Sequence, residues 1–477
     1  MTRTPFSDVM VVLPGIMGSV LQKDGKDLWA LSGSAFVRFF GSLGGSLKQL
    51  RLDGDSPELI DLGDGITPAR LMPDVHLIPR FWKIDGYTGF TSWIQRTFDV
   101  KWGHNYFEFP YDWRRDNRAS ARLLANCSHG WLRQWRERSG NSEARLCLVA
   151  HSMGGLIARY FLECLEGWRV TRHLITLGTP YRGSLNALDY LANGYAASVL
   201  GQRLPEIGLI SNLVAGFTSI YQLLPTFPCV LTEDNSLARI SDIAAAIPNI
   251  NADLLKAANE MHAELDSASA ANRKDPDFLN NGYKIVPFVG AIQQTYQSAV
   301  LADGSLKMSF EHPGHDLQGD GTVPHGSALP LEHQTNGHGG GGTAIILTDR
   351  HACLQNSNAT MANIRNVMGG FRTSFSFRGK PHGVLLDIED AYLTGEPIAI
   401  RVRVDGIPDA GVVLDVRIES TDADMEPVEF SVDGDEHWFP LDLPPLAGGD
   451  YRVTVDPDHG DLDPVVDVFS VWDLEGG

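Results

Sequence analysis

Cysteine is scarce in this sequence, and the few cysteines show no functional spacing. The 477 residues include five cysteines, an odd number without the close pairs that metal ligands need. This excludes a disulfide-stapled scaffold and a zinc ribbon as organising features. The five are Cys127, Cys147, Cys164, Cys229 and Cys353. We expect reduced thiols, no metal site and a cytoplasmic setting.

Long apolar runs are also lacking. No stretch reaches the roughly 18 apolar residues that a membrane-spanning helix requires. Residues 1–8 contain one basic side chain, and the apolar run at 9–13 leads into a turn rather than a small-residue cleavage site. We therefore expect neither a spanning helix nor a signal peptide, and any association with a membrane would be peripheral.

Positive charge is in short supply toward the end of the chain. The formal net charge is -20, and residues 371–477 hold seven Lys and Arg against 24 Asp and Glu. Such a balance excludes nucleic acid as a partner and does not favour an anionic bilayer. Contact with lipid would have to be transient and apolar, and residues 371–477 could instead serve a protein partner.

What the sequence does have is a stretch typical of a nucleophile elbow. Apolar residues 146–150 lead through His151 to Ser152, two glycines follow, and residues 156–162 continue with helical spacing. A serine on a sharp strand-to-helix turn exposes its hydroxyl at the carboxyl end of a sheet strand. Ala150 stands where the usual pattern has a glycine, so the stretch alone leaves an ordinary turn as the alternative.

An acid and a histidine follow the serine in the order found in α/β-hydrolases. Asp320 lies in the turn Gly319–Pro324, and His351 comes just after the apolar run at 343–347. A serine nucleophile needs such a base, and the base needs a carboxylate to fix its tautomer. His151 is interpreted as a packing residue, and five other histidines are less well placed because none directly follows a buried strand: His312, His315, His325, His333 and His338.

Backbone donors for an oxyanion are predicted at two points. The first strand ends at the turn Pro14–Ser19, whose proline and two glycines favour outward-facing N–H groups. The expected donors are the amides of Met17 and of Met153, which follows the nucleophile. For the turn taken alone, a plain loop is the simpler interpretation.

The chain divides by its pattern into two domains. Residues 1–370 alternate strands and helices, with a lid at about 30–85 and an apolar helical cap at about 185–280. Clustered aromatics at 31–50 favour the lid but fit an ordinary buried segment equally well, and the cap could serve an acyl-binding pocket or simply pack on the main domain. Residues 371–477 carry short alternating strands separated by turn residues, which predicts an all-β, immunoglobulin-like sandwich. Asp112 and Arg114, just after the expected strand at 106–110, are interpreted as a structural ion pair.

Six motifs in order also carry a resemblance to a known family. They are Pro14–Ser19, residues 110–114, Ala150–Gly155, residues 178–183, residues 223–225 and Gly319–Pro324. Together they resemble the lecithin:cholesterol acyltransferase family, over roughly residues 8–360. The resemblance implies an α/β-hydrolase with cap and lid and an acyl-enzyme on Ser152. It supports Asp320 and His351 as triad partners and Met17 and Met153 as oxyanion donors. Secreted and lysosomal members carry a disulfide near the lid, which this chain cannot form because it has no cysteine before Cys127.

The expected function is serine-dependent hydrolysis or transfer of an acyl group from a glycerophospholipid ester, without metal or organic cofactor. Water is the favoured acceptor, with an alcohol as the alternative. Two other functions remain open: a soluble carboxylesterase of small esters, and a non-catalytic adaptor acting through residues 371–477.

Overall fold

The architecture comes from a computed structural model of the 477-residue chain. The structure describes residues 3–29, 48–73, 75–78, 82–194, 212–334, 344–370, 383–406, 412–421, 425–434 and 437–473. In this part of the chain, no helix combines the length and the apolar character needed to span a membrane.

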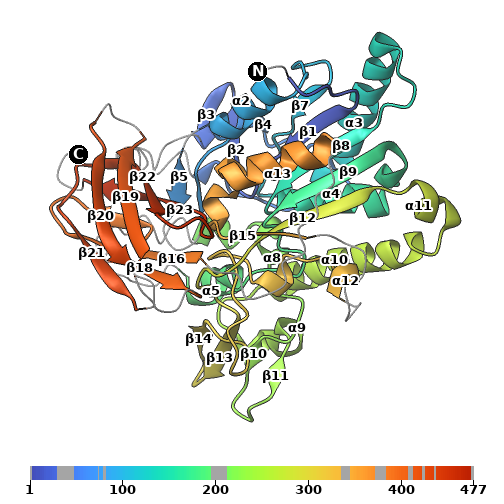
Figure 1. The fold of residues 1–477 in the computed structure, drawn as a ribbon. Helices are drawn as coiled ribbons and strands as arrows, with labels where there is room; N and C mark the ends of the chain where they lie inside the picture. Colours follow the sequence, from blue (N-terminus) through green and yellow to red (C-terminus); the bar gives the residue numbers. More distant parts are fainter. Residues whose placement is uncertain are drawn as a thin grey trace.

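A six-stranded sheet forms the centre of the larger region, and every neighbouring pair in it is parallel (Figure 1). Each strand is largely apolar and mostly buried, as expected for a parallel sheet covered on both faces. In spatial order the strands are β15 (Ile345–Leu347), β12 (Lys284–Gly290), β9 (Thr171–Leu177), β8 (Leu146–His151), β1 (Val9–Leu13) and β7 (Tyr106–Glu108).

The direction in which the chain adds strands reverses between β1 and β8. The chain moves from β1 to β7 on one side, then returns to the other side of β1 and continues outward through β8, β9, β12 and β15. In open parallel sheets, ligands bind beyond the carboxyl ends of the strands at such a switch point. The ends of β1 and β8 carry the turn at 14–19 and Ser152, so the topology brings these two features together.

Helices connect the strands and complete the α/β core. Helix α3 begins after Asp116, whose side chain accepts a hydrogen bond from the Arg118 amide, and it ends at Gly140 in the left-handed conformation. The main helices of this region are α2 (Thr88–Thr97), α3 (Asn117–Ser139), α4 (Gly154–Cys164) and α13 (Asn358–Met368). Helices α3 and α4 pack on each other, and α13 packs on α2.

Smaller sheets flank the core near the predicted lid. The residues expected to form that lid include 30–47, 74 and 79–81, which lie outside the described residues. The small strands are β2 (Ser19–Lys23), β3 (Lys26–Trp29), β4 (Ile66–Leu71), β5 (His76–Ile78) and β6 (Trp82–Ile84). Strands β3 and β4 both pair with β2, directly after the turn at 14–19.

The predicted cap region is mainly helical but is not purely so. Its described helical segments are α5 (Leu185–Asn193), α8 (Thr218–Tyr221), α9 (Ile240–Ile243), η2 (Ala244–Ala246), α10 (Ala252–Asn272) and α11 (Pro276–Asn281). Two short strands within it join a four-stranded sheet with the hairpin that turns at Asp303-Gly304. The two short strands are β10 (Val230–Leu231) and β11 (Leu237–Ala238), and the hairpin consists of β13 (Ser298–Ala302) and β14 (Ser305–Ser309).

Residues after 383 form two sheets on one core, seen on the left of Figure 1. Val402 and Leu386 from one sheet share this core with Val416 and Val453 from the other. The first sheet contains β16 (Gly383–Ile388), β18 (Ile398–Asp405) and β21 (Phe439–Leu443). The second contains β17 (Ala391–Leu393), β23 (Val465–Trp472), β22 (Gly449–Pro457), β19 (Val412–Ser420) and β20 (Val428–Gly434). A C-terminal β-sandwich is therefore present, while its immunoglobulin-like character stays a prediction.

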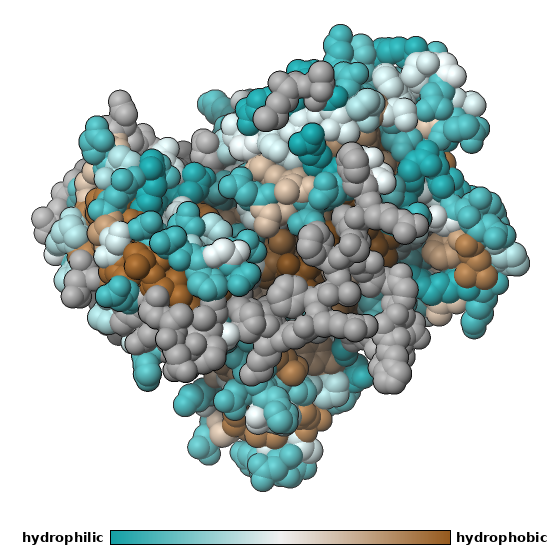
Figure 2. Space-filling view, in the orientation of Figure 1, coloured by the Kyte–Doolittle hydropathy of each residue, from teal (hydrophilic) through white to brown (hydrophobic). Residues whose placement is uncertain are grey.

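The sandwich strands alternate between buried and exposed residues. In β18 and β19, every second side chain enters the shared core. Figure 2 shows hydrophilic side chains over much of the described surface on this face, with hydrophobic ones visible at the sandwich and near the middle of the molecule. The larger region and the sandwich thus each have a core of their own.

Candidate active site

Ser152 sits on a strained turn between β8 and α4. Its φ angle is 50°, in the left-handed region that non-glycine residues rarely occupy. The Ser152 amide donates to the Leu177 carbonyl at 2.8 Å, and the Thr179 hydroxyl donates to the Ser152 carbonyl at 3.0 Å. Both backbone polar groups of Ser152 are therefore hydrogen-bonded, one to strand β9 and one to Thr179. These bonds hold the residue in its strained conformation.

Two glycines make the turn sterically feasible. A Cβ added at Gly155 would lie 1.9 Å from the Thr179 hydroxyl oxygen, and one at Gly154 would lie 2.3 Å from the Pro14 carbonyl. The position of Ala150 is different, since it lies within β8 opposite Leu13 and its methyl group is fully buried. The departure from the usual glycine pattern therefore leaves the turn intact.

The structure brings the three predicted side chains into one hydrogen-bonded chain. His351 Nε2 lies 2.9 Å from Ser152 Oγ, and His351 Nδ1 lies 2.7 Å from Asp320 Oδ2. Each of the three residues is at most 5% exposed. An ionised carboxylate can only accept, so Nδ1 carries a proton and Nε2 is left to accept from the serine hydroxyl. This is the tautomer that a general base at Ser152 requires.

Asp320 is oriented by its own turn. Its Oδ1 accepts the amides of Thr322 at 2.9 Å and Val323 at 2.7 Å, which leaves Oδ2 for the histidine. The Asp320 carbonyl also accepts the His351 amide at 2.8 Å. The acid and the base are therefore joined through both the side chain and the backbone.

Sequence reasoning missed two glycines that create the space for this pair. A Cβ at Gly290, the end of β12, would lie 2.3 Å from Asp320 Cβ. A Cβ at Gly178, after β9, would lie 2.8 Å from His351 Nδ1, and Gly178 also has a φ of 57°. Their position at the carboxyl ends of two buried strands was the available signal, but only the fold shows what faces them.

The predicted oxyanion donors are the residue after the serine and a residue of the turn at 14–19, which approaches Ser152 at Gly15. Met17 has a φ of 55°, and the turn that contains it is closed by a hydrogen bond from the Gly18 amide to the Gly15 carbonyl at 3.1 Å. Met153 precedes the first residue of α4, where helix amides point toward a bound anion. Neither amide donates to another described residue.

His151 does more than fill space beside the nucleophile. Its Nε2 lies 3.1 Å from the His351 carbonyl, and its Nδ1 lies 2.9 Å from the Tyr87 hydroxyl. The Tyr87 oxygen also accepts the Gly15 amide at 2.7 Å. Burial and the neighbouring His351 lower the pKa of His151 to about 3. A neutral ring with the proton on Nε2 satisfies all these contacts and links the turn at 14–19 to the backbone of His351.

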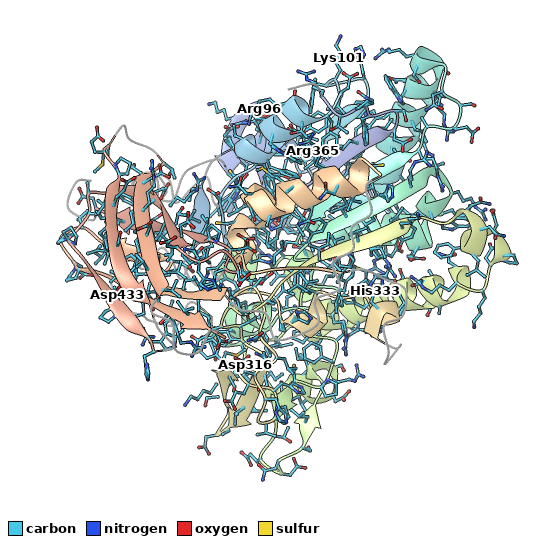
Figure 3. All side chains as sticks on the ribbon, viewed as in Figure 1. Arg96, Lys101, Asp316, His333, Arg365 and Asp433 are labelled. Carbon is cyan, nitrogen blue, oxygen red and sulfur yellow. The ribbon has the colours of Figure 1, made fainter. Side chains whose placement is uncertain are left out.

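The other histidines lie elsewhere. His312 contacts the Pro228 carbonyl at 3.2 Å, and His333 is on α12 (Leu331–Gln334), as labelled in Figure 3. His325 begins η3 (His325–Ser327), and His315 pairs with His312 through the backbone. His338 lies outside the described residues. The structure thus selects His351 as the partner of Ser152.

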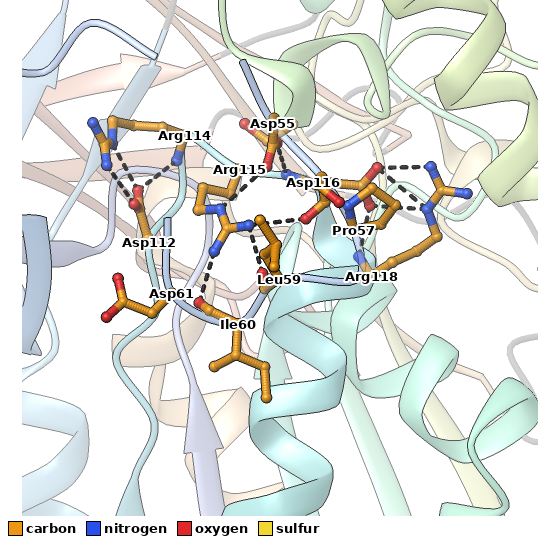
Figure 4. Close-up of polar contacts among 12 residues, drawn as sticks. Asp55, Pro57, Leu59, Ile60, Asp61, Asp112, Arg114, Arg115, Asp116 and Arg118 are labelled. Atoms are coloured by element: carbon orange, nitrogen blue, oxygen red, sulfur yellow. Dashed lines mark hydrogen bonds and ion pairs between the residues drawn. The ribbon is translucent and has the colours of Figure 1, made fainter. Parts of the chain in front are cut away.

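The arginines after β7 serve structural contacts, as predicted for Asp112 and Arg114. The fully buried Arg114 side chain pairs with Asp112 at 2.6 Å and with Asp64 at 2.8 Å. Its neighbour Arg115 donates to the Ile60 carbonyl at 2.7 Å (Figure 4). These arginines fasten the segment around residues 55–64 to the start of α3 rather than face Ser152.

A cavity of about 320 Å³ adjoins the acid and the base. Asp320 and His351 line one side, and sandwich residues 386–390 line another. A larger cavity of about 730 Å³ lies between α2, α13 and the sandwich, and its lining includes none of the three triad candidates. Among the described residues, no group of three or more His, Cys, Asp or Glu side chains is arranged to hold a metal ion.

The fold and the site together define the class: an α/β-hydrolase of the serine hydrolase or acyltransferase type. The lecithin:cholesterol acyltransferase family model matches residues 80–285. This segment includes the elbow, β9 and the whole predicted cap region, and over it the chain is similar to that family. A comparison with curated proteins found no match.

Two solved structures of the Bacillus licheniformis lipase BlEst2 are similar in part. The mature form is 12% identical, has a TM-score of 0.34, and the alignment covers 77% of this chain and 94% of that chain. The propeptide form is 11% identical and has a TM-score of 0.35. Its alignment covers 97% of this chain and 93% of that chain.

Proposed function

We propose that the protein hydrolyses, or transfers, an acyl group of a glycerophospholipid through an acyl-enzyme on Ser152. The observation that carries the proposal is the continuous contact from Ser152 Oγ through His351 to Asp320, at 2.9 Å and 2.7 Å. A serine, a correctly tautomerised histidine and a buried carboxylate in this order are the parts that acyl transfer requires. The relationship to the lecithin:cholesterol acyltransferase family supports a lipid ester as substrate.

In the first half-reaction, Ser152 Oγ attacks the ester carbonyl carbon while His351 Nε2 takes the hydroxyl proton. The negative charge on the carbonyl oxygen is stabilised by the amides of Met17 and Met153, each worth about 3 kcal/mol in comparable sites. Asp320 stabilises the imidazolium by accepting from Nδ1. When the intermediate collapses, the carbon–oxygen bond to the glycerol oxygen breaks and His351 Nε2 returns the proton to that oxygen.

The second half-reaction repeats these roles with a new nucleophile. Water, or an alcohol, attacks the acyl-enzyme and gives its proton to His351 Nε2. Collapse of the second intermediate restores the proton to Ser152 and releases a fatty acid, or a new ester if the acceptor is an alcohol. We propose water as the main acceptor.

Lipid products of the wild-type protein and of Ser152→Ala test this proposal. We expect phosphatidylcholine vesicles to yield lysolipid and fatty acid with the wild type only, as read by mass spectrometry. A fluorophosphonate probe should label the wild type on Ser152, and Ser142→Ala, which changes an exposed serine, should be labelled normally. Product formation by Ser152→Ala would overturn the proposal. An added alcohol shows whether transfer competes with hydrolysis.

One observation favours a carboxylesterase of small esters as a second candidate. The cavity beside His351 has a volume of about 320 Å³ and includes polar side chains such as Gln294 and Asp189. Faster turnover of short, monodisperse esters than of vesicles would select this function. Absence of labelling in folded wild-type protein would instead favour the adaptor alternative.

A further inference from the structure

Arg350 connects the candidate catalytic histidine to the C-terminal sandwich. It directly precedes His351 at the start of η4 (His351–Asn356), and its side chain is 14% exposed. Its guanidinium donates to the Leu386 carbonyl, and its Nε lies 2.5 Å from Asp467 Oδ2. Both partners belong to the sandwich, on β16 and β23.

The same guanidinium also lies beside the acid turn, and both line the cavity next to His351. A Cβ built on Gly321, the residue after Asp320, would lie 3.2 Å from Arg350 Nη2. Gly321 has a φ of 91°, a conformation that favours glycine. Arg350 thus lies next to the acid turn with its side chain and is joined to the candidate base, His351, through the backbone.

Asp467 is fully buried and holds two cations at once. Its Oδ2 lies 2.8 Å from Lys83 Nζ as well as 2.5 Å from Arg350 Nε, and its Oδ1 accepts the Val468 amide at 2.9 Å. Lys83 also pairs with Asp390 at 2.9 Å. Burial opposes the charge of Lys83, but the two carboxylates outweigh it and raise the pKa of Lys83. The carboxylates of Asp390 and Asp467 therefore favour the charged form of Lys83.

Further contacts hold the residues on either side of His351. The Asp85 amide donates to the Ala352 carbonyl at 3.0 Å, and the Asp85 carboxylate pairs with Arg452 of β22. The buried amide of Gln293 donates to the Thr348 carbonyl at 2.9 Å and to the Val384 carbonyl at 3.0 Å. The segment 348–356 is consequently held between the hydrolase core and the sandwich.

We propose that Asp467 is a positioning residue for the candidate catalytic pair: through Arg350 it holds the His351 segment and the Asp320 turn at the separation that both triad hydrogen bonds require. This inference rests on the proposed function. It makes the sandwich a working part of the active site rather than an independent binding module. Since misplacement of a catalytic group by about 1 Å can slow a reaction by ~100-fold, a partial loss of this support is measurable.

The test compares Asp467→Asn with the wild type, using a soluble p-nitrophenyl ester and the fluorophosphonate probe. Neither reagent needs a lipid surface, so the result does not depend on which ester is the natural substrate. We expect kcat and the labelling rate constant to fall by ~10-fold, with KM changed by less than about twofold. Active-site titration counts the protein molecules whose Ser152 can react, which we call competent sites. Both kcat and the labelling rate constant are then given per competent site. A purely structural role would reduce the number of competent sites but leave the rate per site unchanged.

Asp450→Asn is the matched control. Asp450 is also a fully buried aspartate of the sandwich, but its carboxylate accepts a hydrogen bond from the Ser470 hydroxyl within the same sheet. We expect a lower melting temperature for this variant and a wild-type rate per competent site. An equal loss of rate per site in both variants would contradict the proposal.

Two Arg350 variants keep the inference testable if Asp467→Asn folds poorly. Arg350→Lys retains the cation opposite Asp467 and should recover most of the rate that Arg350→Gln loses. The double variant Arg350→Gln/Asp467→Asn should be no slower than the slower single variant, because both act through one pair. Multiplying effects, or equal rates for Arg350→Lys and Arg350→Gln, would overturn the role of the pair. Failure of the wild type to react with the probe would instead count against the proposed function.

Discussion

His151 lies beside the nucleophile, and both of its ring nitrogens make hydrogen bonds. Its protonation therefore affects the stability of the folded protein in acid. Burial and His351 lower the pKa of His151 to about 3 in the folded protein, whereas an unfolded histidine titrates near ~6.5. Between these values the unfolded chain binds the additional proton. Stability from this residue is therefore complete above about pH 6.5 and is lost as the pH falls toward 3.

We predict that His151→Gln flattens the acid side of the stability profile. In the wild type, the free energy of unfolding should fall by up to ~1.4 kcal/mol per pH unit for this one proton. Burial raises the pKa of Asp349 to about 6, so below that pH this carboxyl group makes the free energy of unfolding rise as the pH falls. This contribution is the same in the wild type and in His151→Gln. Urea unfolding between pH 4.5 and 7.5 measures the difference, and parallel profiles would contradict the assignment.

Tyr87 supplies the hydroxyl that joins His151 to the turn at 14–19, so its loss should affect catalysis more than stability. We predict that Tyr87→Phe lowers kcat by ~10-fold with little change in KM, because the Gly15 amide loses its acceptor and the oxyanion turn relaxes. Tyr283→Phe removes a comparable buried hydroxyl, one that donates to Glu163 at 2.7 Å, away from the site. Similar kcat values for the two variants would refute this role.

At this scale the sequence predicted which residue types act and in what order, because an elbow, a Gly-Asp-Gly turn and a histidine after a strand are local patterns. Tyr87, Gly178 and Gly290 were not predictable. Tyr87 meets His151 across 64 positions, and the two glycines matter only because Asp320 and His351 face them. Contacts of this kind leave no local signature.

Among the elements, the elbow depends on close packing of α4 against the loop after β9. We predict that Gly155→Ala costs about 3 kcal/mol of unfolding free energy, because its Cβ would overlap Thr179. Gly130→Ala is the control, since Gly130 lies within α3 with open space around it. That change should stabilise the protein by ~0.8 kcal/mol. Thermal unfolding compares the two, and shifts of the same sign would contradict this reading of the elbow.

Long or strongly patterned elements were predictable, and very short ones were not. The apolar strands of the parallel sheet, a helix over Ala119–Ser139 and the Asp303-Gly304 hairpin follow from periodicity and turn chemistry. In the structure this helix, α3, begins two residues earlier, at Asn117. The pairing of β10 and β11 with that hairpin escaped prediction because each strand has two residues. The region predicted as a helical cap contains mainly helices, and its two short strands join a small sheet.

For the whole molecule, the uneven charge determines how it should meet a lipid surface. With a net charge of -20, most of it after residue 370, approach to an anionic bilayer is opposed by long-range repulsion that salt screens. We predict that hydrolysis of phosphatidylglycerol-containing vesicles rises several-fold between about 20 mM and 500 mM salt, while phosphatidylcholine vesicles show little change. Lysolipid release measures both, and the absence of a difference would show that the charge faces away from the lipid.

The join between the sandwich and the core has a consequence for biosynthesis. Lys83 and Asp467 are 384 positions apart, so a ribosome completes the entire hydrolase core before it makes β23. Parts of a chain that emerge first generally fold first. Until Asp467 has been synthesised, Arg350 cannot form its ion pair with it. A nascent chain would then pass through a stage in which the elbow is folded but the His351 segment is not held in position by this pair. Under the proposed function, competence for acyl transfer would then appear only late in translation.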